Sequence, residues 1–354
     1  MFGTGSDREV DTIVIGAGQA GLATGYHLAR RGQEIALLDA SKAVGASWRD
    51  RWDSLRLFTP VGFDSLPGLP FPGPRREHPT KDQVADYLAG YAQRFALPVM
   101  LDTRVQAVRR EGRGFGVATT RRCWRANSVI IATGAHHTPS IPRLADQLDL
   151  GVVQLHSSTF RGPTQLPAGQ VLVIGAGNSG AEIALDLATD PTTKREVHLA
   201  GRDVGYIPNL GPLTFQILQQ FGRAGAVLAQ QGLRGHGDPL GRIRPGQLEA
   251  TGVQRHPRVT GVRDGMPLLA NGRVLSVAAV IWCTGSRPDY RWLQLDVLNT
   301  AGHLRHRGGV VQGSPGLYTV GLPYQRSITS HLLGGVGTDA HHVAKKLLTR
   351  AAPR

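Results

Sequence analysis

The sequence is poor in cysteine, with only Cys123 and Cys283 in 354 residues. Two distant thiols exclude a disulfide framework, and no C-x-x-C pair is present for dithiol redox chemistry. Long hydrophobic runs are also missing, because the most apolar stretch, residues 210–229, is interrupted by Gln and Arg and a membrane helix needs roughly 18 apolar residues. Histidines lack metal-ligand spacing. We therefore expect a cytoplasmic protein with no transmembrane segment and no metal site.

Negative charge is scarce, with 26 Asp and Glu against 40 Lys and Arg and a formal net charge of +14. The cations are spread along the chain without the interleaved aromatic residues of a nucleic-acid motif, so we expect no specific nucleic-acid partner. A composition of 41% hydrophobic and 19% charged residues is typical of a globular protein. The positive charge reads as an Arg-rich composition spread over a solvated surface, and it is compatible with a modest attraction for anionic substrates.

One pattern occurs twice along the chain. Residues 12–21 read T-I-V-I-G-A-G-Q-A-G, and residues 171–180 read V-L-V-I-G-A-G-N-S-G. In each copy an apolar strand leads into G-x-G-x-x-G and then a helical stretch, and a later apolar strand ends in Thr-Gly, at 128–134 and 279–285. The repeat predicts an α/β fold with two tandem Rossmann-like FAD/NAD(P)-binding domains of three layers each.

The glycine loops predict the phosphate-binding residues. The glycines permit a tight turn, close approach of a pyrophosphate and close helix packing, while the helix N-terminus supplies free N–H groups. The predicted contacts are Gly16, Gly18, Gln19, Ala20 and Gly21 in the first copy, and Gly175, Gly177, Asn178, Ser179 and Gly180 in the second.

The end of the second strand in each copy indicates which ribose is bound. Asp39 ends the strand of the first copy, and a carboxylate there accepts hydrogen bonds from an unphosphorylated ribose, as in FAD or NAD. In the second copy Gly201 takes that place and Arg202 follows. A guanidinium without a carboxylate suits a ribose 2′-phosphate, so the second site is predicted to prefer NADPH.

With these residues, the chain resembles the group B flavin-dependent monooxygenases, above all the compact bacterial and YUCCA-type members, from about residue 11 to about residue 348. Further similar segments are residues 45–49 (G-A-S-W-R), 55–60 (L-R-L-F-T-P), 284–290 (T-G-S-R-P-D-Y) and 321–340. The sequence departs from the family where F-x-G-x-x-x-H is expected. His156 and Phe160 are present, but Leu150 and Val152 replace the Phe and Gly. Pro60 stands where animal flavin monooxygenases carry an active-site Asn.

The resemblance implies FAD and NADPH as cofactors and a reaction between reduced flavin and O2. A C4a-(hydro)peroxyflavin would then pass one oxygen atom to a small organic substrate. It implies no catalytic triad, and His156, Thr59 and Pro60 are candidate positioning residues. Beyond the glycine loops and Asp39, the implied FAD contacts are Ser47, Trp48, Arg49, Leu57, Val105, Thr133, Gly134, Leu322 and Gln325. Beside Arg202, the implied NADPH contacts are Thr284 and Gly285.

The expected organisation is a discontinuous FAD domain, residues 1–146 and 287–354, around an NADPH domain, residues 147–286. Residues 204–246, rich in Gly, Gln and Arg, do not fit regular nucleotide-fold elements and are expected to be an insertion that shapes substrate access. The oligomeric state is left open, and a homodimer is one option.

Two other functions remain open at this point. One is an NADPH–flavin oxidoreductase or oxidase without oxygen transfer, which the altered F-x-G-x-x-x-H segment favours. The other is a non-catalytic flavin-binding regulatory module, against which the two complete cofactor motifs argue.

Overall fold

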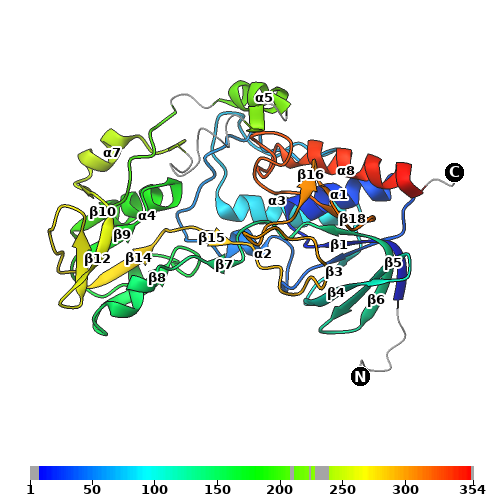
Figure 1. The fold of residues 1–354 in the computed structure, drawn as a ribbon. Helices are drawn as coiled ribbons and strands as arrows, with labels where there is room; N and C mark the ends of the chain where they lie inside the picture. Colours follow the sequence, from blue (N-terminus) through cyan, green and yellow to red (C-terminus); the bar gives the residue numbers. More distant parts are fainter. Residues whose placement is uncertain (1–7, 208–210, 223–224, 228–238, 352–354) are drawn as a thin grey trace.

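The structure is a computed structural model, and it describes residues 8–207, 211–222, 225–227 and 239–351. Its strands form two main sheets that lie side by side and are joined through a narrow middle region (Figure 1). This arrangement confirms the predicted α/β class with two Rossmann-like units. We call them the first unit, around the nine-stranded sheet, and the second unit, around the five-stranded sheet.

The first unit has a parallel centre. Its strand order is β18 (Leu317–Thr319), β6 (Cys123–Ile131), β1 (Arg8–Ile15), β2 (Ile35–Leu38) and β3 (Val99–Met100). Strand β2 is a continuous buried apolar run, and the carboxyl-terminal halves of β1 and β6 are also buried, because both faces of a parallel sheet are covered. The antiparallel strands attached to this centre are β4 (Val105–Glu111), β5 (Gly114–Thr119), β16 (His306–Arg307) and β17 (Val310–Val311).

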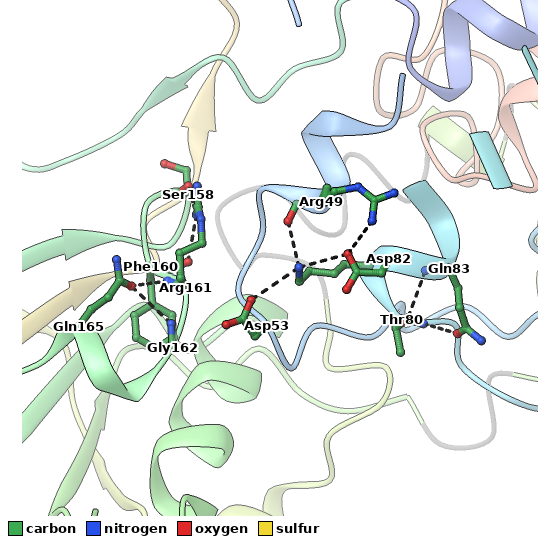
Figure 2. Close-up of polar contacts among 11 residues, drawn as sticks. Arg49, Asp53, Thr80, Asp82, Gln83, Ser158, Phe160, Arg161, Gly162 and Gln165 are labelled. Atoms are coloured by element: carbon green, nitrogen blue, oxygen red, sulfur yellow. Dashed lines mark hydrogen bonds and ion pairs between the residues drawn. The ribbon is translucent and has the colours of Figure 1, made fainter. Parts of the chain in front are cut away.

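Helices α1 (Gln19–Ala29) and α8 (Val336–Ala351) pack together in the first unit, with α3 (Lys81–Arg94) beside α1 (Figure 1). Helix α3 begins at a capping box, in which the Thr80 hydroxyl accepts from the Gln83 N–H and the Gln83 side chain accepts from the Thr80 N–H (Figure 2). This satisfies two N–H groups that a helix start would leave unpaired. The short helix α2 (Ala46–Arg49) packs on α3.

The second unit is a parallel sheet in the order β11 (Gln254–His256), β10 (Val197–Ala200), β9 (Val171–Ile174), β14 (Ala279–Trp282) and β8 (Val153–His156). Helix α4 (Asn178–Thr189) packs on β9 and β10. The smaller elements are the hairpin β12 (Val259–Arg263) with β13 (Met266–Leu269), helix α7 (Pro245–Ala250), and two 3₁₀ turns, Arg143–Gln147 and Pro163–Gln165.

A two-stranded ribbon, β7 (Thr138–Pro139) with β15 (Ser286–Arg287), lies between the two units (Figure 1). It falls beside the predicted domain boundaries at 146/147 and 286/287, which stay predictions. The predicted insertion, residues 204–246, contains helix α5 (Pro212–Gln220) and the start of α7, while residues 208–210, 223–224 and 228–238 lie outside the described residues. Among the helices described, none is long and apolar enough to cross a membrane.

Candidate functional site

The first glycine loop lies between β1 and α1, and close backbone contacts leave no room for a side chain at two of its glycines. Gly16 has φ +102°, and a Cβ on it would lie 2.7 Å from the carbonyl oxygen of Ala132, which follows β6. A Cβ on Gly21 would lie 1.8 Å from the Gly16 oxygen, so the helix approaches the loop as only glycine allows. A Cβ on Gly18 would meet nothing within 4 Å. The loop therefore has open space on the side where a pyrophosphate is expected.

Asp39 follows β2 and is fixed against this loop. Its Oδ2 accepts from the Ala17 N–H at 2.6 Å, and its Oδ1 accepts from the Ser41 N–H at 2.8 Å. The carboxylate is thus adjacent to the glycine turn, where an adenosine ribose lies in this fold. Helix α1 has no acidic residue in its first turn and no side-chain cap, so its N-terminal partial positive charge is left for an anion.

Several segments distant in sequence meet at the start of α1. Gln19 accepts from Trp48 Nε1 at 3.3 Å and donates to the His331 carbonyl at 3.4 Å. A Cβ on Gly321 would lie 2.7 Å from Ala20 Cβ, which places the predicted C-terminal segment against the same helix end. The structure therefore brings together the glycine loop, the G-A-S-W-R segment and the C-terminal segment.

One buried polar atom at this site has no partner. The hydroxyl of Thr133, two residues beyond the end of β6, is buried and makes no hydrogen bond. An unsatisfied buried hydroxyl costs free energy unless a ligand pairs with it. Together with the open side of Gly18 and the free start of α1, it makes the first unit fit a dinucleotide such as FAD.

The remaining predicted FAD contacts differ in how far their side chains are exposed and in what they bind. Ser47 and Arg49 are exposed, and Arg49 pairs with Asp82 at 3.3 Å and Asp86 at 2.6 Å on α3. Gln325 is buried and donates to the Thr319 carbonyl at 3.0 Å. Of the other residues, Leu57 is buried, Gly134 has φ +77°, and Val105 and Leu322 are half-buried.

The loop that holds Thr59 and Pro60 contains a buried carboxyl group that the sequence did not single out. Thr59 Oγ1 donates to Asp64 Oδ2 at 2.9 Å, and Asp64 Oδ1 has no partner. Asp64 is fully buried, and this burial raises its pKa to about 7, although the Thr59 hydrogen bond opposes the shift. Asp64 is therefore protonated below neutral pH and partly protonated near pH 7.

The second glycine loop, between β9 and α4, repeats the geometry of the first. Gly175 has φ +109°, and a Cβ on it would lie 2.3 Å from the Cys283 oxygen. A Cβ on Gly180 would lie 1.8 Å from the Gly175 oxygen, while one on Gly177 would meet nothing within 4 Å. Ser179 is half-buried in the first turn of α4, which has no acidic residue. The second unit thus fits a second dinucleotide.

Asn178 makes contacts that its motif does not predict. Its amide donates to the Pro239 carbonyl at 3.2 Å and accepts from the Gly241 N–H at 3.0 Å. One turn along α4, Glu182 pairs with Arg242 at 3.3 Å, and burial raises the pKa of this carboxyl to about 7 in spite of the Arg. The second glycine motif therefore also anchors the end of the predicted insertion.

Gly201 and Arg202 lie at the end of β10, where Asp39 lies in the first unit. A Cβ on Gly201 would lie 2.7 Å from the Ala176 N atom and 3.0 Å from the Ala176 Cβ. A larger residue does not fit there without a shift of the glycine loop, so a carboxylate at this point is sterically excluded. Arg202 is exposed, and no carboxylate among the described residues lies within ion-pair distance of it.

The Thr-Gly turn of the second unit is tied to the ribbon between the units. Thr284 Oγ1 donates to the Ser140 carbonyl at 2.5 Å, and the Ser140 N–H donates to the Gly285 carbonyl at 2.9 Å. His156 Nε2 is 3.0 Å from the same Gly285 oxygen, and its Nδ1 is 2.8 Å from Ser158 Oγ. Burial lowers the pKa of His156, so the neutral ring donates to Gly285. His156 thus positions the turn.

Helix α5, which follows the second glycine motif, lies against the first unit. Phe215 is buried and stacks on Phe63, with ring centroids 4.9 Å apart and an angle of 27°. Gln219 donates to Thr338 Oγ1 at 2.6 Å. The helix therefore covers the loop after Thr59 and the start of α8.

Lys81 is a buried cation that the sequence did not reveal. Its Nζ donates to the Arg49 carbonyl at 3.0 Å and lies 3.4 Å from Asp82 and 3.6 Å from Asp53 (Figure 2). These partners fix the segment after α2 on α3. Across the part of the chain that is described, no group of three or more His, Cys, Asp or Glu side chains is placed to hold a metal ion.

Comparisons with known proteins agree with this geometry. The family model described as pyridine nucleotide-disulphide oxidoreductase matches residues 13–212. An uncharacterised CzcO-like oxidoreductase of Geobacillus kaustophilus is 38% identical, over 96% of this chain and 98% of the relative. The indole-3-pyruvate monooxygenase YUCCA1 of Oryza sativa is 28% identical, over 95% and 90%. The solved flavin-containing monooxygenase of Stenotrophomonas maltophilia is 30% identical, with a TM-score of 0.81 over 98% of this chain and 100% of that chain.

Proposed function

The chain belongs to the pyridine nucleotide-disulphide oxidoreductase family and to its group B flavin-dependent monooxygenases, and we propose that it uses NADPH and O2 to transfer one oxygen atom to a small organic substrate. FAD is the proposed ligand of the first unit and NADPH that of the second. We also propose that the domains follow the predicted division, residues 1–146 with 287–354 and residues 147–286.

The observation that carries this proposal is the pair of glycine cradles with different groups at the ribose position. Asp39 accepts the Ala17 N–H beside the first loop, while Gly201 leaves no space for a carboxylate beside the second. An acceptor suits the unphosphorylated ribose of FAD, and the exposed Arg202 suits the 2′-phosphate of NADPH.

In this scheme the chain's own residues bind the two cofactors and orient them. The starts of α1 and α4 would hold the phosphates, and the buried Thr133 hydroxyl would gain a hydrogen-bond partner from a dinucleotide bound in the first unit. His156 holds the Gly285 turn at the junction of the units. When bound, the flavin supplies the redox chemistry, accepting hydride and reacting with O2.

Anaerobic stopped-flow absorbance tests the proposal. The purified, FAD-loaded protein is mixed with NADPH, and O2 is admitted in a second mix. Bleaching followed by a long-lived absorbing species, with oxygenated product formed from an added substrate, is the expected result. Bleaching followed by direct reoxidation and stoichiometric peroxide would instead identify an oxidase. Absence of bleaching would contradict NADPH as the donor and point to a non-catalytic module.

A further inference from the structure

Two arginines, one from each unit, lie on segments that meet at the junction. Arg51 lies two residues beyond α2 in the first unit, and Arg161 lies five residues beyond β8 in the second. The segments are in direct contact, because the Asp53 N–H donates to the Arg161 carbonyl at 2.8 Å. Both side chains are half-buried.

The polar contacts of these arginines are to neutral oxygens. Arg161 Nη1 donates to the carbonyls of Ser158 at 3.0 Å and Phe160 at 3.2 Å, and Arg51 Nε donates to the Ser47 carbonyl at 3.2 Å. The nearby Asp53 carboxylate is directed to Lys81 instead, at 3.6 Å. Within the described ranges, neither guanidinium has a carboxylate within 4.0 Å.

The surroundings of Arg51 disfavour its positive charge. Burial lowers the pKa of Arg51, and the charge of Arg161 lowers it further. The pKa of His156 is lowered mainly by burial, with a smaller contribution from Arg51. Half-buried cations without a counter-charge are costly, and an anion between them would offset that cost.

We propose that Arg51 and Arg161 form an anion-binding subsite that holds a phosphate or carboxylate group of a ligand crossing from one unit to the other. The proposal rests on the proposed function, because it takes that ligand to be one of the reactants.

The position of the subsite favours such a ligand. Arg161 follows His156, at the carboxyl end of β8, and β8 pairs with β14, whose end leads into the Thr284–Gly285 turn. In open parallel sheets ligands bind outside the carboxyl ends of the strands. The adenosine end is assigned under the proposed function to Arg202, which lies two residues beyond β10, away from β8 in the sheet order. The subsite therefore suits either the phosphate of the nicotinamide half of the dinucleotide or the carboxylate of an acidic substrate.

Binding by isothermal titration calorimetry to the FAD-loaded protein distinguishes these sources. The variants are Arg51→Gln and Arg161→Gln, and Arg263→Gln, an exposed arginine on β12, is the matched control. The probes are NADP⁺ with adenosine 2′,5′-bisphosphate, which lacks the nicotinamide half, and phenylpyruvate with phenylacetone, which lacks the carboxylate.

A dinucleotide phosphate at the subsite predicts that each variant weakens NADP⁺ binding by about tenfold to a hundredfold, the range for a charged hydrogen bond, and leaves the bisphosphate unchanged. A substrate carboxylate predicts the same loss for phenylpyruvate but none for phenylacetone. If both variants bind all four probes within about twofold of the control, the subsite is refuted.

Folding is checked by thermal melting. If a Gln variant does not fold, Arg51→Lys and Arg161→Lys, which keep the charge but lose the planar fork, decide the question in the same titrations. Failure of the proposed function would show in the unaltered protein as absent NADP⁺ binding. Failure of the subsite would show only as unaffected variants.

Discussion

Replacing Arg202 by glutamine gives the sharpest test of nucleotide preference. Arg202 follows Gly201 at the end of β10, is exposed, and has no carboxylate partner among the residues described. Its guanidinium is therefore available for a 2′-phosphate. Arg202→Gln removes the charge and keeps much of the side-chain length, so the loss should be confined to a ligand that carries the phosphate.

The size of the effect follows from the exposure of the side chain. A hydrogen bond to a charged group contributes about 1.5–3 kcal/mol, but exposed pairs lie at or below the bottom of this range. We therefore expect kcat/KM for NADPH to fall by about tenfold, which corresponds to about 1.4 kcal/mol. The value for NADH should change by less than about twofold, because NADH has no 2′-phosphate for the guanidinium to bind.

The assay is the rate of flavin reduction by each nucleotide under anaerobic conditions. Arg202→Lys should recover part of the NADPH rate because it restores the charge without the planar fork. Arg263→Gln serves as the control for a general change in surface charge. Equal losses with NADPH and NADH, or no loss with either, would refute the assignment of Arg202 to the 2′-phosphate.

Three further changes test other parts of the structure. Gly180→Ala places a Cβ 1.8 Å from the Gly175 oxygen. NADP⁺ binding should therefore weaken by about tenfold to a hundredfold, with bound flavin retained. Loss of flavin instead would show that the two glycine loops are not independent. Burial raises the pKa of Asp64 from 3.8 to about 7, so the folded state holds a proton that the unfolded state has lost, and stability falls as pH rises through this window. Asp64→Asn should flatten this pH dependence and raise the free energy of unfolding above pH 7 by up to about 4 kcal/mol. Melting temperatures of both proteins at acidic and alkaline pH measure the change. An unchanged pH profile would contradict a raised pKa of Asp64. Phe215→Ala should lower the free energy of unfolding by about 3 kcal/mol through lost packing and speed amide hydrogen exchange in α5. Leu213→Ala, at a 67% exposed position, should do neither. Equal exchange in both variants would exclude docking of α5 through Phe215.

The sequence by itself determined the fold class and the two glycine loops. Strand β9 is a continuous apolar run, β1 ends in one, and each glycine motif specifies a turn and a helix start within about ten residues. This information is local, so it can be read from contiguous residues. The assignment of Asp39 and Arg202 to two different riboses was also made from the sequence, and it stays a prediction.

Contacts between distant residues were decided only by the tertiary structure. Arg51 and Arg161 are separated by more than one hundred positions, and their segments meet at the junction, where the Asp53 N–H donates to the Arg161 carbonyl. Asp64 reads as an ordinary loop residue, and only its burial beside Thr59 changes its protonation. Asn178 lies in a nucleotide motif, yet its amide is bound to the segment that ends the insertion. Local sequence fixes backbone conformation through sterics and periodicity, whereas burial and long-range pairing depend on how the completed elements pack.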